Sequence, residues 1–362
     1  MYLEFFGLKE YPFRLTPDVD FLYMSSAHAR AKAYMDYSVW NREGFVVITG
    51  DIGCGKTTLI QKLLSELNDE DVLVAKIFQT QLDDVEFLQA VLVEFGLNPF
   101  SAKKVELMDM LNSFLIENFH KERQAILIVD EAHNLNAKAL EEIRMLSGLE
   151  TQKEKILHVI LVGQPQLNEM LDSPEMEQLT QRVRLRFHLK PLVAADTADY
   201  IAHRLKVAGA QRQDIFEAGT APMIYEYTGG VPRLMNTLCD TALTCAYADS
   251  IPSVTKAVIG TAADELQWLP YAKRINDRRL KERTARAVKM GSLSGEQERR
   301  LANIGNRLNQ LDSLTPELSS MAAKMGNIEV LLKQILKVMQ HKEEEDVDPG
   351  TQKKSQQRRS PV

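Results

Sequence analysis

The feature that most constrains this chain is a glycine-rich loop between an apolar run and a helical pattern. Residues 50–57 read Gly-Asp-Ile-Gly-Cys-Gly-Lys-Thr, which matches the motif GxxxxGK[ST]. The apolar run 45–49 precedes the loop, and the helical pattern begins near Lys56. Glycines here let successive backbone N–H groups turn inward around a phosphate chain. This context predicts a nucleotide-binding P-loop and disfavours an incidental glycine-rich turn.

The side chains of the loop predict how it binds. We expect Lys56 to neutralise the β- and γ-phosphates and Thr57 to ligate Mg²⁺, with the start of the helix adding its positive dipole end. Oxidation of Cys54 would block nucleotide, but the simpler interpretation is that the loop needs a small residue there. The residues expected to bind nucleotide are Gly50, Asp51, Ile52, Gly53, Cys54, Gly55, Lys56, Thr57 and Thr58.

Two acidic residues follow the apolar run 125–129. In a parallel sheet Asp130 comes to the carboxyl edge beside the P-loop, where it can complete the magnesium shell. Glu131 is then placed to orient and deprotonate the attacking water. Alternatively, the two acids cap the following helix. The P-loop upstream favours the catalytic interpretation.

Two further polar residues are candidates for sensing the nucleotide. Gln164 follows the run 156–162, and its amide can hydrogen-bond the γ-phosphate or the attacking water. Arg233 follows the turn 228–231 and lies one residue inside a helix, where it can couple hydrolysis to movement of a lid. The alternative for Arg233 is an ordinary capped turn.

An arginine-rich strand is predicted over residues 183–189. Period-two alternation puts Arg182, Arg184 and Arg186 on one face. A solvated edge strand explains this pattern. A sharper hypothesis makes one of them, with Arg182 preferred, an arginine finger that reaches the nucleotide of a neighbouring subunit.

Alternating strands and helices predict an α/β fold with a parallel P-loop sheet covered by helices on both faces. The apolar runs 45–49, 72–78, 125–129, 156–162 and 183–189 read as its strands, and the strand signals stop at Lys190. The expected order along the chain is an α/β domain with an N-terminal segment (1–189), a helical lid (190–269), a basic linker or helix (270–296), a coiled coil (297–341) and a disordered tail (342–362).

Charge and cysteine content exclude several classes. A net charge of −6 over 362 residues excludes a uniformly basic nucleic-acid binder, although residues 273–289 carry a local +6, from eight Lys and Arg against Asp277 and Glu282. The odd set Cys54, Cys239 and Cys245 fits neither a disulfide framework nor a zinc site. No signal peptide or membrane span is found, so we expect a cytoplasmic protein.

The motifs in order are GDIGCGKT, LIVDEAH, LVGQP, QRVRLR and TGGVPR, preceded by FFGLKEYPFRLTPDVDFLY. Over residues 1–268 this set resembles the AAA+ ATPases of the general secretion pathway protein A family, especially the branch associated with exosortase and exopolysaccharide loci. The resemblance implies ATP hydrolysis, a five-stranded sheet and an N-terminal segment that brings Pro12-Phe13 and Pro17-Asp18 near the adenine. It gives functional positions to Lys56, Thr57, Asp130, Glu131, Gln164 and Arg233.

Family members often continue into a membrane span and a peptidoglycan-binding domain, and this chain shows neither. We therefore expect an ATP- and Mg²⁺-dependent homo-oligomer, cytoplasmic or peripheral at the inner membrane, that powers or regulates assembly of a secretion, pilus or exopolysaccharide export system. Its coiled coil would bind export proteins, and residues 273–289 would contact anionic lipid or DNA. The alternative is a DNA-associated ATPase similar to transposition target-selection or replication-initiator proteins.

Overall fold

The computed structural model describes residues 2–40, 45–67, 71–78, 80–99, 103–150 and 154–289. The predicted coiled coil (297–341), the predicted tail (342–362) and the end of the basic segment lie outside these residues. The chain divides into two units, Met1–Ile275 and Asn276–Val362. The sheet, the lid and the pocket all belong to the first unit.

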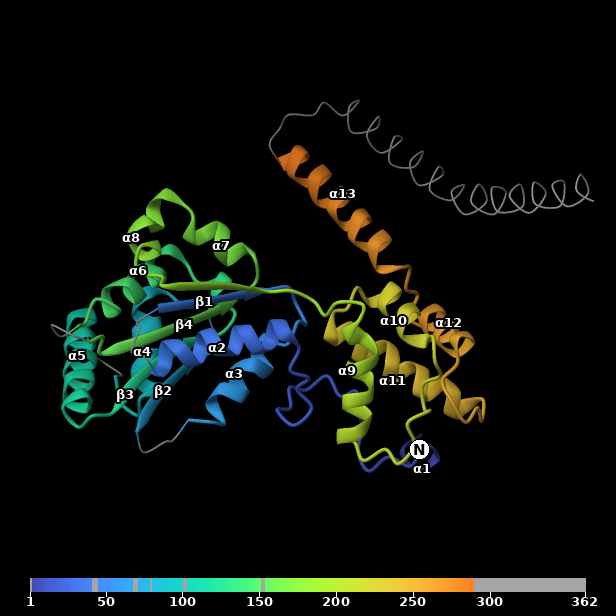
Figure 1. Ribbon diagram of the computed structural model, residues 1–362. Coiled ribbons are helices and arrows are strands. Elements are labelled where there is room, and N and C mark those ends of the chain that lie inside the picture. The colour runs from blue at the N-terminus through green and yellow to red at the C-terminus, as the bar shows by residue number, and fades with distance from the viewer. Residues whose placement is uncertain are drawn as a thin grey trace, which may run out of the picture. The chain divides into compact units, whose positions relative to one another are not determined.

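A parallel sheet of five strands forms the centre of the α/β part (Figure 1). The strand order is β2-β3-β4-β1-β5, so β4 lies between the strand that precedes the P-loop and the strand that precedes Asp130. Since the strands are parallel, the carboxyl ends of β1, β3 and β4 meet at one edge of the sheet. The strands are β1 (Phe45–Gly50), β2 (Val72–Ile77), β3 (Gln124–Val129), β4 (Leu157–Gly163) and β5 (Leu185–Leu189).

Helices cover both faces of this sheet. One face packs against α2 (Ser26–Trp40) and α3 (Lys56–Leu64), which Figure 1 shows in blue. The other face packs against α4 (Asp84–Glu94), α5 (Lys104–His120) and α6 (Ala137–Leu146). The central strands β1, β3 and β4 are buried on both faces, which explains their unbroken runs of Val, Ile and Leu. The predicted α/β class with a helix-covered parallel sheet is confirmed.

Short elements connect β3 to β5. They are the 3₁₀ helix η1 (Ala132–Asn134), α7 (Gln166–Leu171), the 3₁₀ helix η2 (Pro174–Met176) and α8 (Glu177–Thr180). The prediction that the fifth strand begins at residue 183 is wrong by two residues. The chain is still in the turn after α8 at Arg182, and β5 begins only at Leu185.

A helical part follows the sheet, as predicted. It consists of α9 (Asp196–Val207), α10 (Thr220–Thr228), α11 (Pro232–Ala248) and α12 (Lys256–Glu265), and we call these four helices the lid. The basic helix α13 (Tyr271–Lys289) begins in the first unit and continues into the second.

The N-terminal segment packs on the lid although it precedes the sheet in sequence. Helix α1 (Tyr2–Phe6) contacts α11, and Tyr2 donates a hydrogen bond to the Asp240 carboxylate on that helix. Phe13 and Phe21 are buried in the same apolar cluster as Leu238. Burial of such aromatic side chains is worth about 1.5–3 kcal/mol each, so the lid's core includes the first residues of the chain.

Among the described residues, none of the helices combines the length and the hydropathy that a membrane span requires.

Candidate active site

The P-loop joins β1 to α3 through two glycines in the left-handed region. Gly53 has φ +84° and Gly55 has φ +92°, and Gly55 caps the N-terminus of α3. A Cβ at Gly53 would come within 2.6 Å of the Arg233 Cβ, so the lid approaches the loop too closely for a side chain there. The backbone N–H of Arg233 also donates to the Gly53 carbonyl, at 3.2 Å. The left-handed glycines allow the backbone N–H groups of the loop to turn inward, as binding of a phosphate chain requires.

Lys56 is buried at the base of the loop. Its Nζ donates to the carbonyl oxygens of Gly50 at 2.8 Å and Asp51 at 3.1 Å. Backbone carbonyl dipoles therefore hold the ammonium beside the P-loop. Within the described part of the chain, Lys56 forms no ion pair with a carboxylate within 4.0 Å. A buried cation in this position can pair with phosphate oxygens.

Thr57 and Asp130 lie together at the sheet edge. The Thr57 hydroxyl donates to Asp130 Oδ2 at 2.9 Å, although the residues are 73 positions apart. A hydroxyl and a carboxylate in contact are oxygen ligands that suit Mg²⁺, which usually keeps several waters and substrate phosphates besides its few protein ligands. Among the described residues no group of three or more His, Cys, Asp or Glu could hold a metal by itself. The pair fits a magnesium ion that arrives with a nucleotide.

Glu131 follows Asp130 in a strained backbone conformation. Its φ is +52°, a region that costs a non-glycine residue about 1–3 kcal/mol and is often found at functional sites. Its N–H donates to Asp130 Oδ1 at 2.9 Å, and its carbonyl accepts from the Thr80 hydroxyl at 3.2 Å. This conformation leaves the Glu131 side chain 43% exposed, and it lines the pocket beside the P-loop.

Gln164 lies at the end of β4, between the P-loop and the acidic pair. Its Nε2 is 2.7 Å from His133 Nε2 and 3.5 Å from Glu131 Oε2. The structure therefore brings Gln164 to Glu131, as the strand order requires. His133 is the residue between them that the sequence interpretation left without a role.

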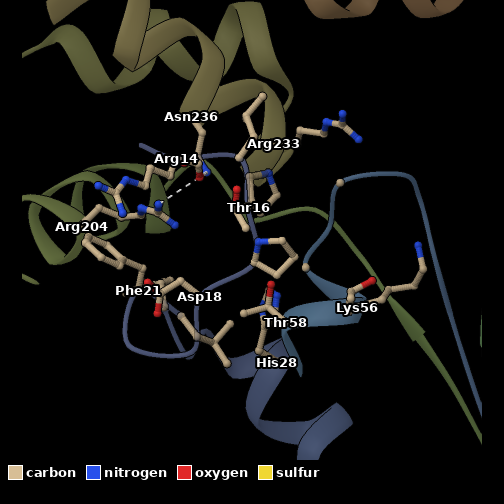
Figure 2. A pocket seen from close by; sticks show the side chains of 18 of the residues that line it. Arg14, Thr16, Asp18, Phe21, His28, Lys56, Thr58, Arg204, Arg233 and Asn236 are labelled. Atoms are coloured by element: carbon tan, nitrogen blue, oxygen red, sulfur yellow. Dashed lines mark hydrogen bonds between the residues drawn. The ribbon is translucent and has the colours of Figure 1, made fainter. Parts of the chain in front are cut away.

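Most of the predicted residues line one pocket beside the P-loop (Figure 2). The cavity has a volume of about 210 Å³. Gly50, Asp51, Cys54, Asp130 and Gln164 lie next to it without lining it. The predicted residues that line it are Ile52, Gly53, Gly55, Lys56, Thr57, Thr58, Glu131 and Arg233.

The N-terminal segment and the lid form the rest of the pocket wall, which includes Pro17 and Asp18 but neither Pro12 nor Phe13. Arg204 of α9 is buried, with Nε donating to the Pro12 carbonyl and Nη2 to the Arg14 carbonyl at 3.3 Å. Asn236 of α11 donates to the same Arg14 carbonyl at 3.3 Å. In Figure 2, Arg14, Arg204 and Asn236 lie together, across the view from Lys56.

Sequence reasoning missed Arg14, Arg204 and Asn236, because no motif marks a wall built from separate segments. It also missed His28, which supports the P-loop from α2. His28 Nε2 is 2.9 Å from the Cys54 carbonyl, and its Nδ1 is 2.8 Å from the Ser25 hydroxyl. Burial lowers the pKa of His28, so the ring is neutral and donates to the loop.

Cys54 is buried beneath the loop among side chains of α2 and α3. Burial raises the pKa of its thiol to about 12. Since the thiolate is the reactive form, this thiol is inert at neutral pH, in agreement with the interpretation that a small residue is needed there.

The three arginines near β5 lie away from the pocket. Arg182 donates from Nη1 to the Arg144 carbonyl and, at 3.1 Å, to the Ser147 hydroxyl at the end of α6. Arg186 pairs with Asp172 at 2.7 Å. The prediction that Arg182, Arg184 and Arg186 share one face of a strand is wrong for Arg182, because Arg182 precedes β5. Arg186 is exposed on the edge strand β5, and Arg184 is exposed directly before that strand.

Residues 40–171 match the AAA domain family. The chain is 39% identical over 271 residues to General secretion pathway protein A of Aeromonas hydrophila, a match that covers 74% of this chain and 49% of that protein. The chain thus spans about half the length of this curated relative.

Two solved structures are similar in fold. The Aeropyrum pernix ORC2 protein in its ADPNP-ADP complexes has a TM-score of 0.56 and 17% identity, covering 85% of this chain and 84% of that one. Cdc6p from Pyrobaculum aerophilum has a TM-score of 0.54 and 14% identity, covering 87% and 89%. At these identities the likeness concerns the fold alone.

Proposed function

The chain is an AAA-domain protein related to General secretion pathway protein A, and we propose that it binds ATP in this pocket and hydrolyses it to ADP and phosphate. One observation carries the proposal. The P-loop, the Thr57–Asp130 pair and Glu131 meet at the carboxyl edge of β1 and β3, although 73 residues separate Thr57 from Asp130. This arrangement supplies groups for phosphate, metal and water at one place.

The P-loop binds the phosphates in this proposal. Gly53 and Gly55 turn backbone N–H groups toward the pocket, and the N-terminus of α3 adds its dipole. Lys56 exchanges the carbonyl oxygens of Gly50 and Asp51 for phosphate oxygens, which carry more negative charge.

Thr57 and Asp130 would hold Mg²⁺ through a hydroxyl and a carboxylate oxygen. When bound, this ion neutralises charge on the β- and γ-phosphates.

In this proposal Glu131, Gln164 and Arg233 act in the hydrolysis step. Glu131 accepts a proton from the attacking water, since its carboxylate is exposed to the pocket. The Gln164 amide, within 3.5 Å of that carboxylate, contacts the γ-phosphate or the water. Arg233 lies at the start of α11 beside Gly53, so it links the γ-phosphate to the lid.

The Glu131→Gln variant tests this function. We expect it to bind ATP normally and to release phosphate about a hundredfold more slowly or worse, because the amide cannot accept the proton. Binding is measured with a fluorescent ATP analogue and turnover by phosphate release with Mg²⁺. Glu117→Gln, an exposed carboxylate on α5, is the matched control and should match the wild type. Equal turnover of Glu131→Gln and the wild type would reject the assignment.

We further propose that the ATPase works as a homo-oligomer on a bacterial envelope export system, either general secretion, a pilus or exopolysaccharide export. The 39% identity to General secretion pathway protein A over 271 residues supports a secretion role. The chain would act from the cytoplasm, as a protein peripheral to the inner membrane, with the residues after α13 contacting export proteins.

A DNA-associated ATPase is the second candidate, because α13 is basic. Lys273, Arg278, Arg279 and Lys281 carry its charge in the part whose side chains are described, whereas Arg274 packs over the Trp268 ring at 4.4 Å. Such a helix suits DNA phosphates or anionic lipid headgroups.

Binding assays with 30-base-pair duplex DNA and with phosphatidylglycerol vesicles, each at several salt concentrations, separate the two candidates. The envelope proposal predicts salt-sensitive vesicle binding that Lys273→Gln/Arg278→Gln/Arg279→Gln/Lys281→Gln weakens. Tight DNA binding without vesicle binding would overturn it.

A further inference from the structure

We propose that His133 is a positioning residue that links the water-activating carboxylate of Glu131 to the phosphate-sensing amide of Gln164. The inference rests on the proposed ATPase function and assigns a further residue to the same site. His133 lies in η1, two residues after Glu131 of the acidic pair that follows β3.

The imidazole ring lies between the two side chains. His133 Nδ1 is 3.4 Å from Glu131 Oε2, and His133 Nε2 is 2.7 Å from Gln164 Nε2. The main-chain N–H of Gln164 is also directed at Nδ1, at 3.3 Å. The His133 side chain is only 11% exposed, so its partners must come from the protein.

The ring is held in place by close packing. A Cβ at Gly163 would lie 3.2 Å from the His133 backbone nitrogen and 3.4 Å from Nδ1, so glycine before Gln164 leaves just enough room for η1. The close packing of β4 and η1 therefore places His133 directly beside the end of β4 that leads into Gln164.

A neutral ring offers one donor and one acceptor, so Nδ1 either accepts from the Gln164 main-chain N–H or donates to Glu131. In the proposed arrangement the proton is on Nδ1, 3.4 Å from Glu131 Oε2, and Nε2 accepts from the Gln164 amide, so the Gln164 main-chain N–H gives up Nδ1. The second N–H of that amide points to Glu131 Oε2 at 3.5 Å, which closes a ring of three side chains. Burial lowers the pKa of His133 and favours this neutral form. The charge of Lys56 also lowers this pKa, whereas the carboxylates of Glu131 and Asp130 raise it.

Both N–H groups of Gln164 are engaged in this arrangement, so the amide must release at least one to contact a γ-phosphate. When it does, His133 loses its donor at Nε2 and Glu131 loses a neighbour. His133 therefore lets the orientation of Glu131 depend on what Gln164 binds. Its contribution belongs to the chemical step rather than to nucleotide affinity.

The test compares His133→Ala and His133→Gln in the full chain, with kcat and KM for ATP measured separately. We expect His133→Ala to lower kcat by about tenfold, the effect of one lost hydrogen bond, and to leave KM unchanged. His133→Gln should recover most of kcat, since an amide also donates and accepts hydrogen bonds. His120→Ala, an exposed histidine on α5, is the control.

A double variant shows whether His133 acts through Gln164. We expect His133→Ala/Gln164→Ala to be little slower than Gln164→Ala alone, because the link is already lost. Multiplicative losses, or an unchanged kcat in His133→Ala, would overturn the inference. If His133→Ala does not fold, His133→Asn replaces it, since the shorter amide reaches one partner at most. A wild-type chain without ATP turnover would instead reject the ATPase proposal itself.

Discussion

Burial decides the chemistry of single side chains around the P-loop. His28 and Cys54 touch each other through the Cys54 carbonyl, and both are almost completely buried. Burial keeps the ring neutral and the thiol protonated, because neither charged form finds enough compensation beneath the loop. These two residues support the loop, whereas exposed Glu131 carries the chemistry.

His28 should make the fold sensitive to acid. Its pKa is lowered below the ordinary 6.5, so below pH 6.5 the unfolded chain takes up a proton that the folded chain does not. The free energy of unfolding therefore falls as pH drops, by at most about 1.4 kcal/mol per pH unit from this group. We expect His28→Gln to shift its urea midpoint less than the wild type between pH 7 and pH 5.

Exposed His120, replaced by Gln, serves as the reference and should leave the pH dependence unchanged. An equally steep loss of stability in His28→Gln and the wild type would mean that His28 is not the group that titrates.

At the level of elements, two tight approaches connect the lid to the sheet. Gly53 of the P-loop faces Arg233 on α11, and Gly230 in the turn before α11 faces the segment between β5 and α9. Leu192 N–H donates to the Gly230 carbonyl at 2.9 Å. These glycines let α11 start beside the P-loop, so the position of Arg233 depends on backbone contacts rather than on its own side chain.

Replacing Gly230 should therefore be costly. Gly230 has φ +73°, and a Cβ there would lie 2.0 Å from the Leu192 carbonyl oxygen. We expect Gly230→Ala to lower the thermal unfolding midpoint, with a loss of about 2 kcal/mol or more.

Gly260→Ala is the matched control for Gly230→Ala. Gly260 lies inside α12, and its new Cβ would meet nothing closer than Met223 Cε at 3.7 Å. Because alanine is the better helix former by about 1 kcal/mol, this variant should unfold at a higher temperature than the wild type. A Gly230→Ala variant as stable as the wild type would contradict the close packing of the turn.

In the proposed oligomer, each subunit would contribute a residue to the ATP site of its neighbour. The pocket contains Lys56 and Arg233, but none of the three arginines at or before β5 lines it. Arg182 is held by its own subunit at the Arg144 carbonyl and the Ser147 hydroxyl. To act as an arginine finger it must leave these partners when a neighbouring subunit binds.

Mixing two inactive variants tests this proposal. If Arg182 serves a neighbour's nucleotide, Arg182→Ala alone should lose about a thousandfold or more in turnover and Glu131→Gln alone about a hundredfold or more, and a mixture of the two should recover part of it. Ser147→Ala removes a partner of Arg182 but no charge, and should stay active. No recovery in a mixture that light scattering shows to be assembled would exclude Arg182 as the finger.

Local patterns were enough to predict the α/β class, the P-loop and the order of its partners. The motif at residues 50–57 and the apolar run before Asp130 are properties of neighbouring residues, and parallel strands bring their carboxyl ends to one edge in any such sheet. For this reason Thr57, Asp130, Glu131 and Gln164 could be expected together before any coordinates.

Tertiary packing alone decided which further residues join them. The Pro12 and Arg14 carbonyls meet Arg204 and Asn236 across about 190 and 222 positions of sequence, and His28 meets Cys54 from a separate helix. Such contacts depend on how buried polar groups find partners in the folded core, which no short motif encodes. The same packing placed Arg182 in a turn against α6 rather than on a strand, and turned His133 toward both Glu131 and Gln164.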